Sequence, residues 1–185
     1  MTSVSLFARS MAGVLLAGTL LSARAIDFTP DAVSVQAGAG RAGVDTVGVG
    51  VIWDWKFQQL RRKAELTAHT ELMVSGWRAD DVGGGNQRLV QVVLLPSLRM
   101  RLARGESPWF IEFGIGASYL GKDYITPDKA FSTRWNFYDM LGIGHSFGEK
   151  REHELGLRLV HVSNAGIRKP NPGEDFLHLR YVRRF

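Results

Sequence analysis

Three side chains near the end of the chain have the types that serine hydrolases combine. His161 and Ser163 are separated by one residue, and Asp175 follows in the next segment. In an extended strand, residues i and i+2 point to the same side with Cα atoms about 6.6 to 6.8 Å apart, so an imidazole can reach the hydroxyl. A histidine that activates a serine, and is itself oriented by a carboxylate, is suited to nucleophilic attack on an acyl group.

The segments around this trio continue a two-residue period. The residues that share its parity are apolar or aromatic, namely Leu155, Leu157, Leu159, Leu177, Leu179 and Tyr181. If His161 pairs with Asp175 across a hairpin, this register builds an apolar ladder and places the carboxylate beside the imidazole. The neighbouring acid, Glu174, points to the opposite face. We therefore expect the trio on an apolar face, where polar groups are costly and commonly functional.

The first 25 residues have the pattern of a secretory signal peptide. Arg9 precedes an apolar run from Met11 to Leu21, and a small-x-small site follows at residues 23–25. The run is shorter than the roughly 20 apolar residues of a membrane-spanning helix. Cleavage leaves one domain, residues 26–185, and lowers the net charge from +5 to +3 because Arg9 and Arg24 are lost. Such mild basicity gives little indication of nucleic-acid binding, and the lack of cysteine excludes disulfides.

The segment from Trp109 to Tyr119 shows the clearest alternation in the chain. Every second residue is apolar with an aromatic at each end, and the residues between them include Glu112 and two glycines. At about 3.4 Å per residue and a tilt of roughly 40°, the two ends stand about 26 Å apart along a membrane normal. This matches the apolar band of about 25 Å, with aromatic girdles, of an outer-membrane barrel.

Similar segments bring the prediction to eight strands, an even number that can close a small antiparallel barrel. They lie within residues 33–40, 47–55, 65–74, 90–101, 109–119, 134–147, 153–163 and 176–185. The opposite faces carry charges of both signs, at Glu65, Glu71, Glu112, Arg99, Arg101, Arg158 and Arg180. A soluble lipocalin-like barrel would turn the apolar face inward. The apolar alternation that ends in Phe185 is typical of outer-membrane barrels, so we predict an all-β transmembrane β-barrel with a polar, side-chain-filled interior.

A periplasmic C-terminus assigns each connection to a side. Residues 80–86, 121–132 and 164–174 become outer loops, while residues 103–107 and 148–152 become short inner turns, as is usual for such barrels. The first hairpins run against this rule, since the outer turn 41–43 is short and the inner connection 56–63 is long. Pro96 interrupts its ladder and predicts a local bulge.

Two further patterns are not expected to bind a ligand. Residues 38–43 match G-x-G-x-x-G, but a strand follows where a dinucleotide site needs a helix. None of the five histidines forms an H-E-x-x-H pair, and His153 and His161 are too far apart along one strand to share an ion. We expect no cofactor and no metal.

The stretch from residue 161 to 166, His-Val-Ser-Asn-Ala-Gly, followed by Pro-Asn-Pro-Gly at 170–173 and an acid, resembles the PagL-type lipid A 3-O-deacylase family of outer-membrane enzymes. The roles that the resemblance implies are a general base at His161, a nucleophile at Ser163, an orienting acid at Asp175, and supporting or oxyanion-hole groups at Asn164, the Gly166 N–H and the Asn171 side chain. The family usually has Glu where this chain has Asp175. Either the strands approach more closely here, or a bulge brings Glu174 into the role.

The resemblance implies an esterase that removes the acyl chain at the 3-position of lipid A through an acyl-enzyme. Because the trio lies at the outer ends of its strands, lipopolysaccharide is expected to enter from the outer leaflet of the outer membrane. The 3-position follows from the resemblance alone. Two alternatives remain open. One is a non-enzymatic small barrel for adhesion or envelope stability, and the other is acyl transfer to another lipid by the same residues.

Overall fold

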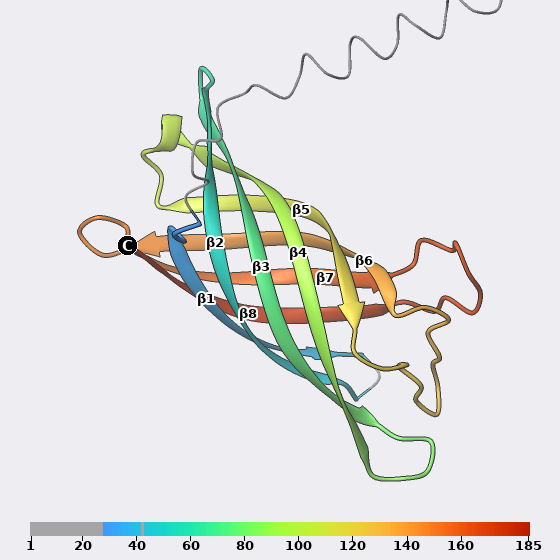
Figure 1. Ribbon diagram of the computed structural model, residues 1–185. Coiled ribbons are helices and arrows are strands. Elements are labelled where there is room, and N and C mark those ends of the chain that lie inside the picture. Colours follow the sequence, from blue (N-terminus) through green and yellow to red (C-terminus); the bar gives the residue numbers. More distant parts are fainter. Residues whose placement is uncertain (1–27, 42) are drawn as a thin grey trace, which may run out of the picture.

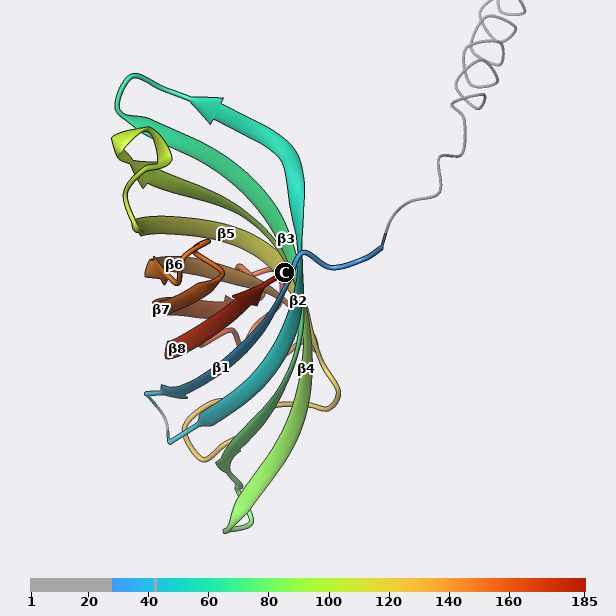
Figure 2. The same cartoon turned by 90° about the vertical axis from the view of Figure 1, so that its left-hand side faces the viewer.

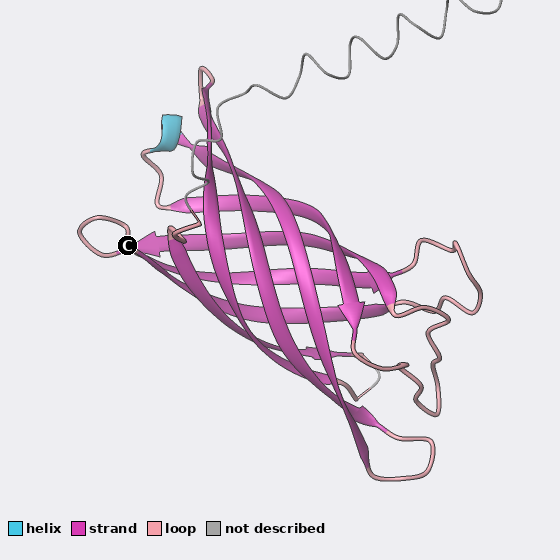
Figure 3. Cartoon of the chain, viewed as in Figure 1, coloured by secondary structure: helices cyan, strands magenta, loops and turns pink. Residues whose placement is uncertain are grey.

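The computed structural model describes residues 28–41 and 43–185, so the predicted signal peptide lies outside the described residues. One closed antiparallel barrel is formed, in which each strand pairs with the next and β1 pairs with β8 (Figures 1 and 3). Its elements are β1 (Ala32–Gly40), β2 (Asp45–Leu60), β3 (Ala64–Asp80), β4 (Asn86–Leu102), the short 3-10 helix η1 (Ala103–Gly105), β5 (Trp109–Leu120), β6 (Trp135–Phe147), β7 (His153–Ser163) and β8 (Glu174–Arg184). The predicted eight-stranded barrel is confirmed.

Two-residue alternation decides which side chains face outward. In β5, Trp109, Ile111 and Phe113 are about half exposed, whereas Phe110 and Glu112 between them are buried. We call the end with loops 81–85, 121–134 and 164–173 the outer end, and the opposite end the inner end. The long strands β2, β3 and β4 reach beyond their neighbours (Figure 2). Within the described residues, no helix has the length and apolar character that a membrane span requires.

Paired charges fill the middle of the barrel, as predicted. Arg158 forms ion pairs with Glu71 (2.8 Å) and Glu112 (2.9 Å), and Arg99 joins Glu112 (3.1 Å) to Glu154 (2.6 Å). All five side chains are almost completely buried. Because each charge has an opposite partner within hydrogen-bonding distance, the network can remain ionised away from water.

The interior near the outer end contains a cluster of aromatic rings, which the alternation alone did not predict. Trp77 makes edge contacts with Tyr124 and Phe176, with ring centroids 5.5 and 4.8 Å apart, and Tyr124 packs against Phe131 at 4.9 Å. We call these four rings the aromatic plug. Since two of them belong to loop 121–134, this loop folds into the mouth of the barrel.

The predicted bulge at Pro96 is wrong. Pro96 pairs with Thr70 in an unbroken register on the β3 side, while the pairing with β5 lapses at Leu95 and Pro96 and then resumes without a shift. The ladder tolerates the missing N–H by opening locally, so no extra residue is inserted. The register shift of this barrel lies in β2 instead, between Asp54 and Gln58.

The inner connection after β2 is also shorter than predicted. β2 continues to Leu60, and the Arg61 N–H donates to the Ala64 carbonyl at 2.7 Å to close a tight turn. The shift in β2 hid this part of the strand from the sequence analysis because it breaks the two-residue alternation. The rule of short inner turns and longer outer loops is therefore obeyed at this hairpin too. The first outer connection, between β1 and β2, is short and remains an exception.

Candidate active site

The hairpin of β7 and β8 brings His161 and Asp175 together at the outer end. The two residues are direct partners in the ladder, and Leu159 pairs with Leu177 next to them, so the predicted register is confirmed. His161 Nδ1 and Asp175 Oδ1 lie 2.7 Å apart. Both side chains are about half exposed on the outward face of the barrel. The carboxylate can thus orient the imidazole and stabilise its protonated form.

Glu174 occupies the opposite face of β8. Its side chain is fully buried inside the barrel, where Tyr124 and Lys129 contact its carboxylate. The register of β7 and β8 contains no bulge that would turn it outward. Of the two acids that the sequence left open, Asp175 is the one beside His161.

Ser163 is the last residue of β7 and lies two residues beyond His161. It is 7% exposed, and its Oγ accepts a hydrogen bond from the Ala165 N–H at 3.4 Å. Across the described part of the chain, no hydrogen bond joins Ser163 to His161. Bonds of this kind are often long or poorly aligned until a substrate is seated. The structure thus forms the His161–Asp175 contact and keeps Ser163 within one strand repeat of it.

Asn164 ties the loop after Ser163 to its neighbour, loop 121–134. Its buried Nδ2 donates to Ser132 Oγ at 3.0 Å, to Thr133 Oγ1 at 3.1 Å and to the Arg168 carbonyl at 2.9 Å. Asn164 therefore holds both outer loops together beside the serine, and its supporting role in catalysis stays a prediction.

The two groups expected in the oxyanion hole lie in the same loop. The Gly166 N–H donates to Asn164 Oδ1 at 3.0 Å, and Asn171 Oδ1 accepts the Asn164 N–H at 3.0 Å. This leaves Asn171 Nδ2 without a hydrogen-bond partner among the described residues. Ala165 and Gly166 have φ of 53° and 77°, in the left-handed region that is costly for a residue with a Cβ. An oxyanion hole formed by Gly166 and Asn171 stays a prediction.

Gly173 is a site residue that the sequence analysis did not single out. A Cβ at this position would lie 2.6 Å from Cε1 of His161, and the φ of 66° also favours glycine. Only a residue without a side chain lets the imidazole take its place beside Asp175. The signal in the sequence was a glycine directly before the two acids.

A cavity of about 400 Å³ opens on the outward wall beside the pair. Its lining is mostly apolar and polar only at Arg41, Asp139, His161 and Asp175. Asp139 is the direct partner of His161 on β6, so carboxylates flank the imidazole on both sides. It has no hydrogen bond or ion pair within the described residues. Its place on the apolar face of its strand was visible in the sequence, and the cavity can hold an apolar chain next to the imidazole.

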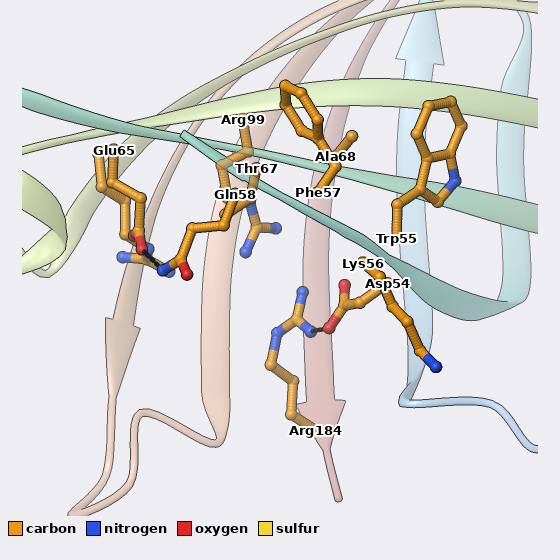
Figure 4. Close-up of a pocket in the computed structure, with 11 residues that line it drawn as sticks. Asp54, Trp55, Lys56, Phe57, Gln58, Glu65, Thr67, Ala68, Arg99 and Arg184 are labelled. Atoms are coloured by element: carbon orange, nitrogen blue, oxygen red, sulfur yellow. Dashed lines mark hydrogen bonds and ion pairs between the residues drawn. The ribbon is translucent and has the colours of Figure 1, made fainter. Parts of the chain in front are cut away.

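A second cavity, of about 600 Å³, lies at the inner end of the barrel (Figure 4). Its acids are already paired, because Arg184 contacts Asp54 at 2.6 Å and Gln58 donates to Glu65 at 2.5 Å. No serine or histidine lines it. This cavity therefore lacks the serine and histidine that acyl-ester hydrolysis of the proposed kind needs.

Comparison with known proteins agrees with this fold and shows the family. Residues 45–184 match the family model described as Lipid A 3-O-deacylase (PagL). A Lipid A deacylase PagL of Pseudomonas aeruginosa is 31% identical over 151 residues, which cover 80% of this chain and 83% of the relative. One of Bordetella bronchiseptica is 34% identical over 134 residues, covering 72% and 70%. A crystal structure of the outer membrane enzyme PagL superposes with a TM-score of 0.72 and 26% identity, covering 83% and 99%. The chain belongs to the lipid A 3-O-deacylase (PagL) family.

Proposed function

We propose that this protein is an outer-membrane lipid A deacylase, a serine esterase that hydrolyses the acyl ester at the 3-position of lipid A. The observation that carries the proposal is the His161–Asp175 pair, 2.7 Å apart on the outward apolar wall and one strand repeat from Ser163. A soluble esterase encloses such a pair in a cleft of its own. Here the pair faces the surroundings of the barrel, so its substrate is an acyl chain that lies along the wall.

The outward surface of the barrel supports the proposal that the protein lies in a membrane. Outward valines, leucines, isoleucines and phenylalanines of all eight strands are about half exposed, an apolar surface far larger than a protein in water tolerates. Aromatic pairs stand at both ends of it, Trp109 with His145 towards the inner end and Tyr119 with Trp135 towards the outer end. Such pairs match the two girdles of a transmembrane barrel. Lipid A would reach the cavity beside His161 laterally.

The reaction proceeds through an acyl-enzyme. Ser163 attacks the ester carbonyl carbon while His161 takes the hydroxyl proton, and Asp175 stabilises the imidazolium that forms. Asn171 Nδ2 stabilises the oxyanion of the tetrahedral intermediate, and the Gly166 N–H joins it when it turns from Asn164 Oδ1 to the oxyanion. The imidazolium then protonates the leaving sugar oxygen, and a water activated by His161 releases the fatty acid and restores Ser163.

The aspartate at position 175 fits this role despite its short side chain. Asp175 and His161 are direct partners in the ladder, where Cβ atoms stand about 4.5 to 5.5 Å apart. The carboxylate already reaches Nδ1 at 2.7 Å. The direct pairing of the two residues thus favours Asp175 as the triad acid without a bulge.

Labelling with a fluorophosphonate separates this proposal from an inert barrel. The probe reacts with a serine that a histidine activates, so the purified protein in detergent should be labelled at Ser163, and Ser163→Ala should not be labelled. A barrel that serves only adhesion or envelope stability would stay unlabelled. The released products separate hydrolysis from acyl transfer, because hydrolysis yields free fatty acid and transfer yields an acylated second lipid.

A further inference from the structure

Loop 121–134 enters the barrel and contacts β8 at Gly173 and Glu174, directly before the triad acid. We call these contacts of Tyr124 and Lys129 the grip. The Tyr124 hydroxyl donates to Glu174 Oε2 at 2.9 Å, and Lys129 Nζ lies 3.1 Å from Glu174 Oε1. The same ammonium group donates to the Gly173 carbonyl at 3.0 Å. The two residues that precede Asp175 are therefore held by three contacts from one loop.

The residue after Asp175 is anchored as well. Phe176 belongs to the aromatic plug, in which Trp77 bridges it to Tyr124. Asp175 thus sits between two inward anchors, Glu174 and Phe176, and both are connected to Tyr124. The backbone that carries the carboxylate has little freedom to move away from His161.

The gripping loop is itself ordered by its own hydrogen bonds. The Phe131 N–H donates to the Tyr124 carbonyl at 2.9 Å, and the Thr126 N–H donates to the Lys129 carbonyl at 2.7 Å. On the far side, the Gln87 side chain donates to the carbonyl of Ile125. Tyr124 and Lys129 are therefore presented from a closed turn that is fixed at β4.

Contact between Gly173 and His161 links this grip to the imidazole. Since a Cβ at Gly173 would lie 2.6 Å from His161 Cε1, a small shift of Gly173 alters the space in which the ring lies. The carbonyl of the same glycine is the one that Lys129 holds. Loss of the grip would therefore disturb the imidazole and the carboxylate together.

We infer that Tyr124 and Lys129 are positioning residues of the catalytic site, acting through Glu174 and Gly173 on Asp175 and His161. The inference rests on the proposed deacylase function and extends it to a loop that lines no part of the cavity beside His161. Burial and the neighbouring Glu174 carboxylate raise the pKa of Tyr124 well above its usual range. Its hydroxyl therefore keeps its proton and remains a donor.

The test compares steady-state hydrolysis of lipid A by the wild type, Tyr124→Phe, Lys129→Met and the double variant. We expect kcat of the double variant to fall about tenfold or more with KM within about twofold, because misplacing catalytic groups by 1 Å can cost up to about 100-fold. The rate of fluorophosphonate labelling should fall with kcat, since it reports the His–Ser pair without lipid binding. Lys129→Arg, which keeps the cation, should recover most of kcat.

Arg134→Met is the matched control in the same loop. It breaks the exposed pair with Asp123, 2.8 Å long, and leaves Glu174 and Gly173 untouched. Its kcat should equal that of the wild type. A double variant with wild-type kcat and labelling rate would overturn the inference, and so would an equal loss in Arg134→Met. If the double variant does not fold, the single variant Tyr124→Phe tests the inference, and we expect its kcat to fall about threefold. A wild type that releases no acyl chain would instead contradict the proposed function.

Discussion

At the scale of single residues, the candidate site depends on which side of a strand each side chain faces. The partnership of His161 and Asp175 could be predicted because parity and a simple hairpin register were enough to place them. The fit of Gly173 against the imidazole could not, since it depends on a backbone φ and on a contact across strands. Likewise, the contacts of Tyr124 and Lys129 with Glu174 inside the barrel could not be predicted from the sequence.

The two acids should respond differently to truncation. Asp175→Ala removes the partner of His161 Nδ1, and we expect deacylation to fall by about 10³ to 10⁴-fold, as for other triads that lose the orienting acid. Asp175→Glu should keep substantial activity, because the longer side chain retains the carboxylate that can hold His161 Nδ1. Glu174→Ala should lower kcat far less. Measurement of kcat in folded, purified variants checks this order, and a larger loss in Glu174→Ala would contradict the assignment of the acid.

Adding one methyl group at Gly173 should impair the site. Gly173→Ala places a Cβ 2.6 Å from His161 Cε1, so we expect kcat to fall at least about tenfold by displacement of the imidazole. Gly84→Ala is the control, because its φ of 86° imposes a similar backbone penalty with nothing within 4 Å. It should keep wild-type kcat. Equal activity of both variants would show that the contact has no role in turnover.

At the scale of elements, period-two alternation identified every strand but not their ends or their irregularities. Because of the register shift in β2, the sequence did not reveal that this strand continues to Leu60. At Pro96, the ladder with β3 keeps its register where a bulge was predicted. Loop 121–134 could be placed on the outer side, but its entry into the barrel could not be predicted, because loop sequence alone does not show which side chains pack inward. That loop and the loop after Ser163 form one hydrogen-bonded unit through Asn164.

Removal of the Asn164 side chain should loosen this unit. Asn164→Ala deletes the donors to Ser132, Thr133 and Arg168 and the acceptor for Gly166. We expect limited trypsin digestion to cut after Arg168 at least about tenfold faster, since local opening governs cleavage of a folded protein. Peptide mapping by mass spectrometry follows the cut. An unchanged rate would mean that the loop is held by other contacts.

At the scale of the whole molecule, the barrel is turned inside out relative to a soluble protein. Charges of both signs in the sequence predicted a filled interior, and the Arg158–Glu71–Glu112 contacts confirm it. The aromatic plug escaped prediction because Trp77 and Phe176 share an inward parity with charged residues, and nothing in the alternation tells apolar layers of the interior from charged ones.

A buried ion pair should matter far more than an exposed one. Arg158→Met removes one cation from the buried network, so that Glu71 keeps only Arg180 and Glu112 keeps only Arg99 as a close partner. One negative charge in the interior is then uncompensated, and we expect the free energy of unfolding to fall by about 3 to 5 kcal/mol. Arg78→Met, which breaks an exposed pair with Asp45 at 2.5 Å, should cost at most about 1 kcal/mol. Urea unfolding in lipid vesicles, followed by tryptophan fluorescence, compares the two variants. Equal losses would contradict the account of the interior.

The central claim is that this barrel removes an acyl chain from lipid A by means of Ser163. The most direct test is the lipid A mass profile of outer membranes from a host that lacks such activity, with and without this chain expressed. We predict that wild-type protein yields lipid A lighter by one ester-linked acyl chain, and that Ser163→Ala, present as a folded barrel at the same level, leaves the profile unchanged. Undiminished loss of the acyl chain with Ser163→Ala, or no loss with the wild type, would contradict the account.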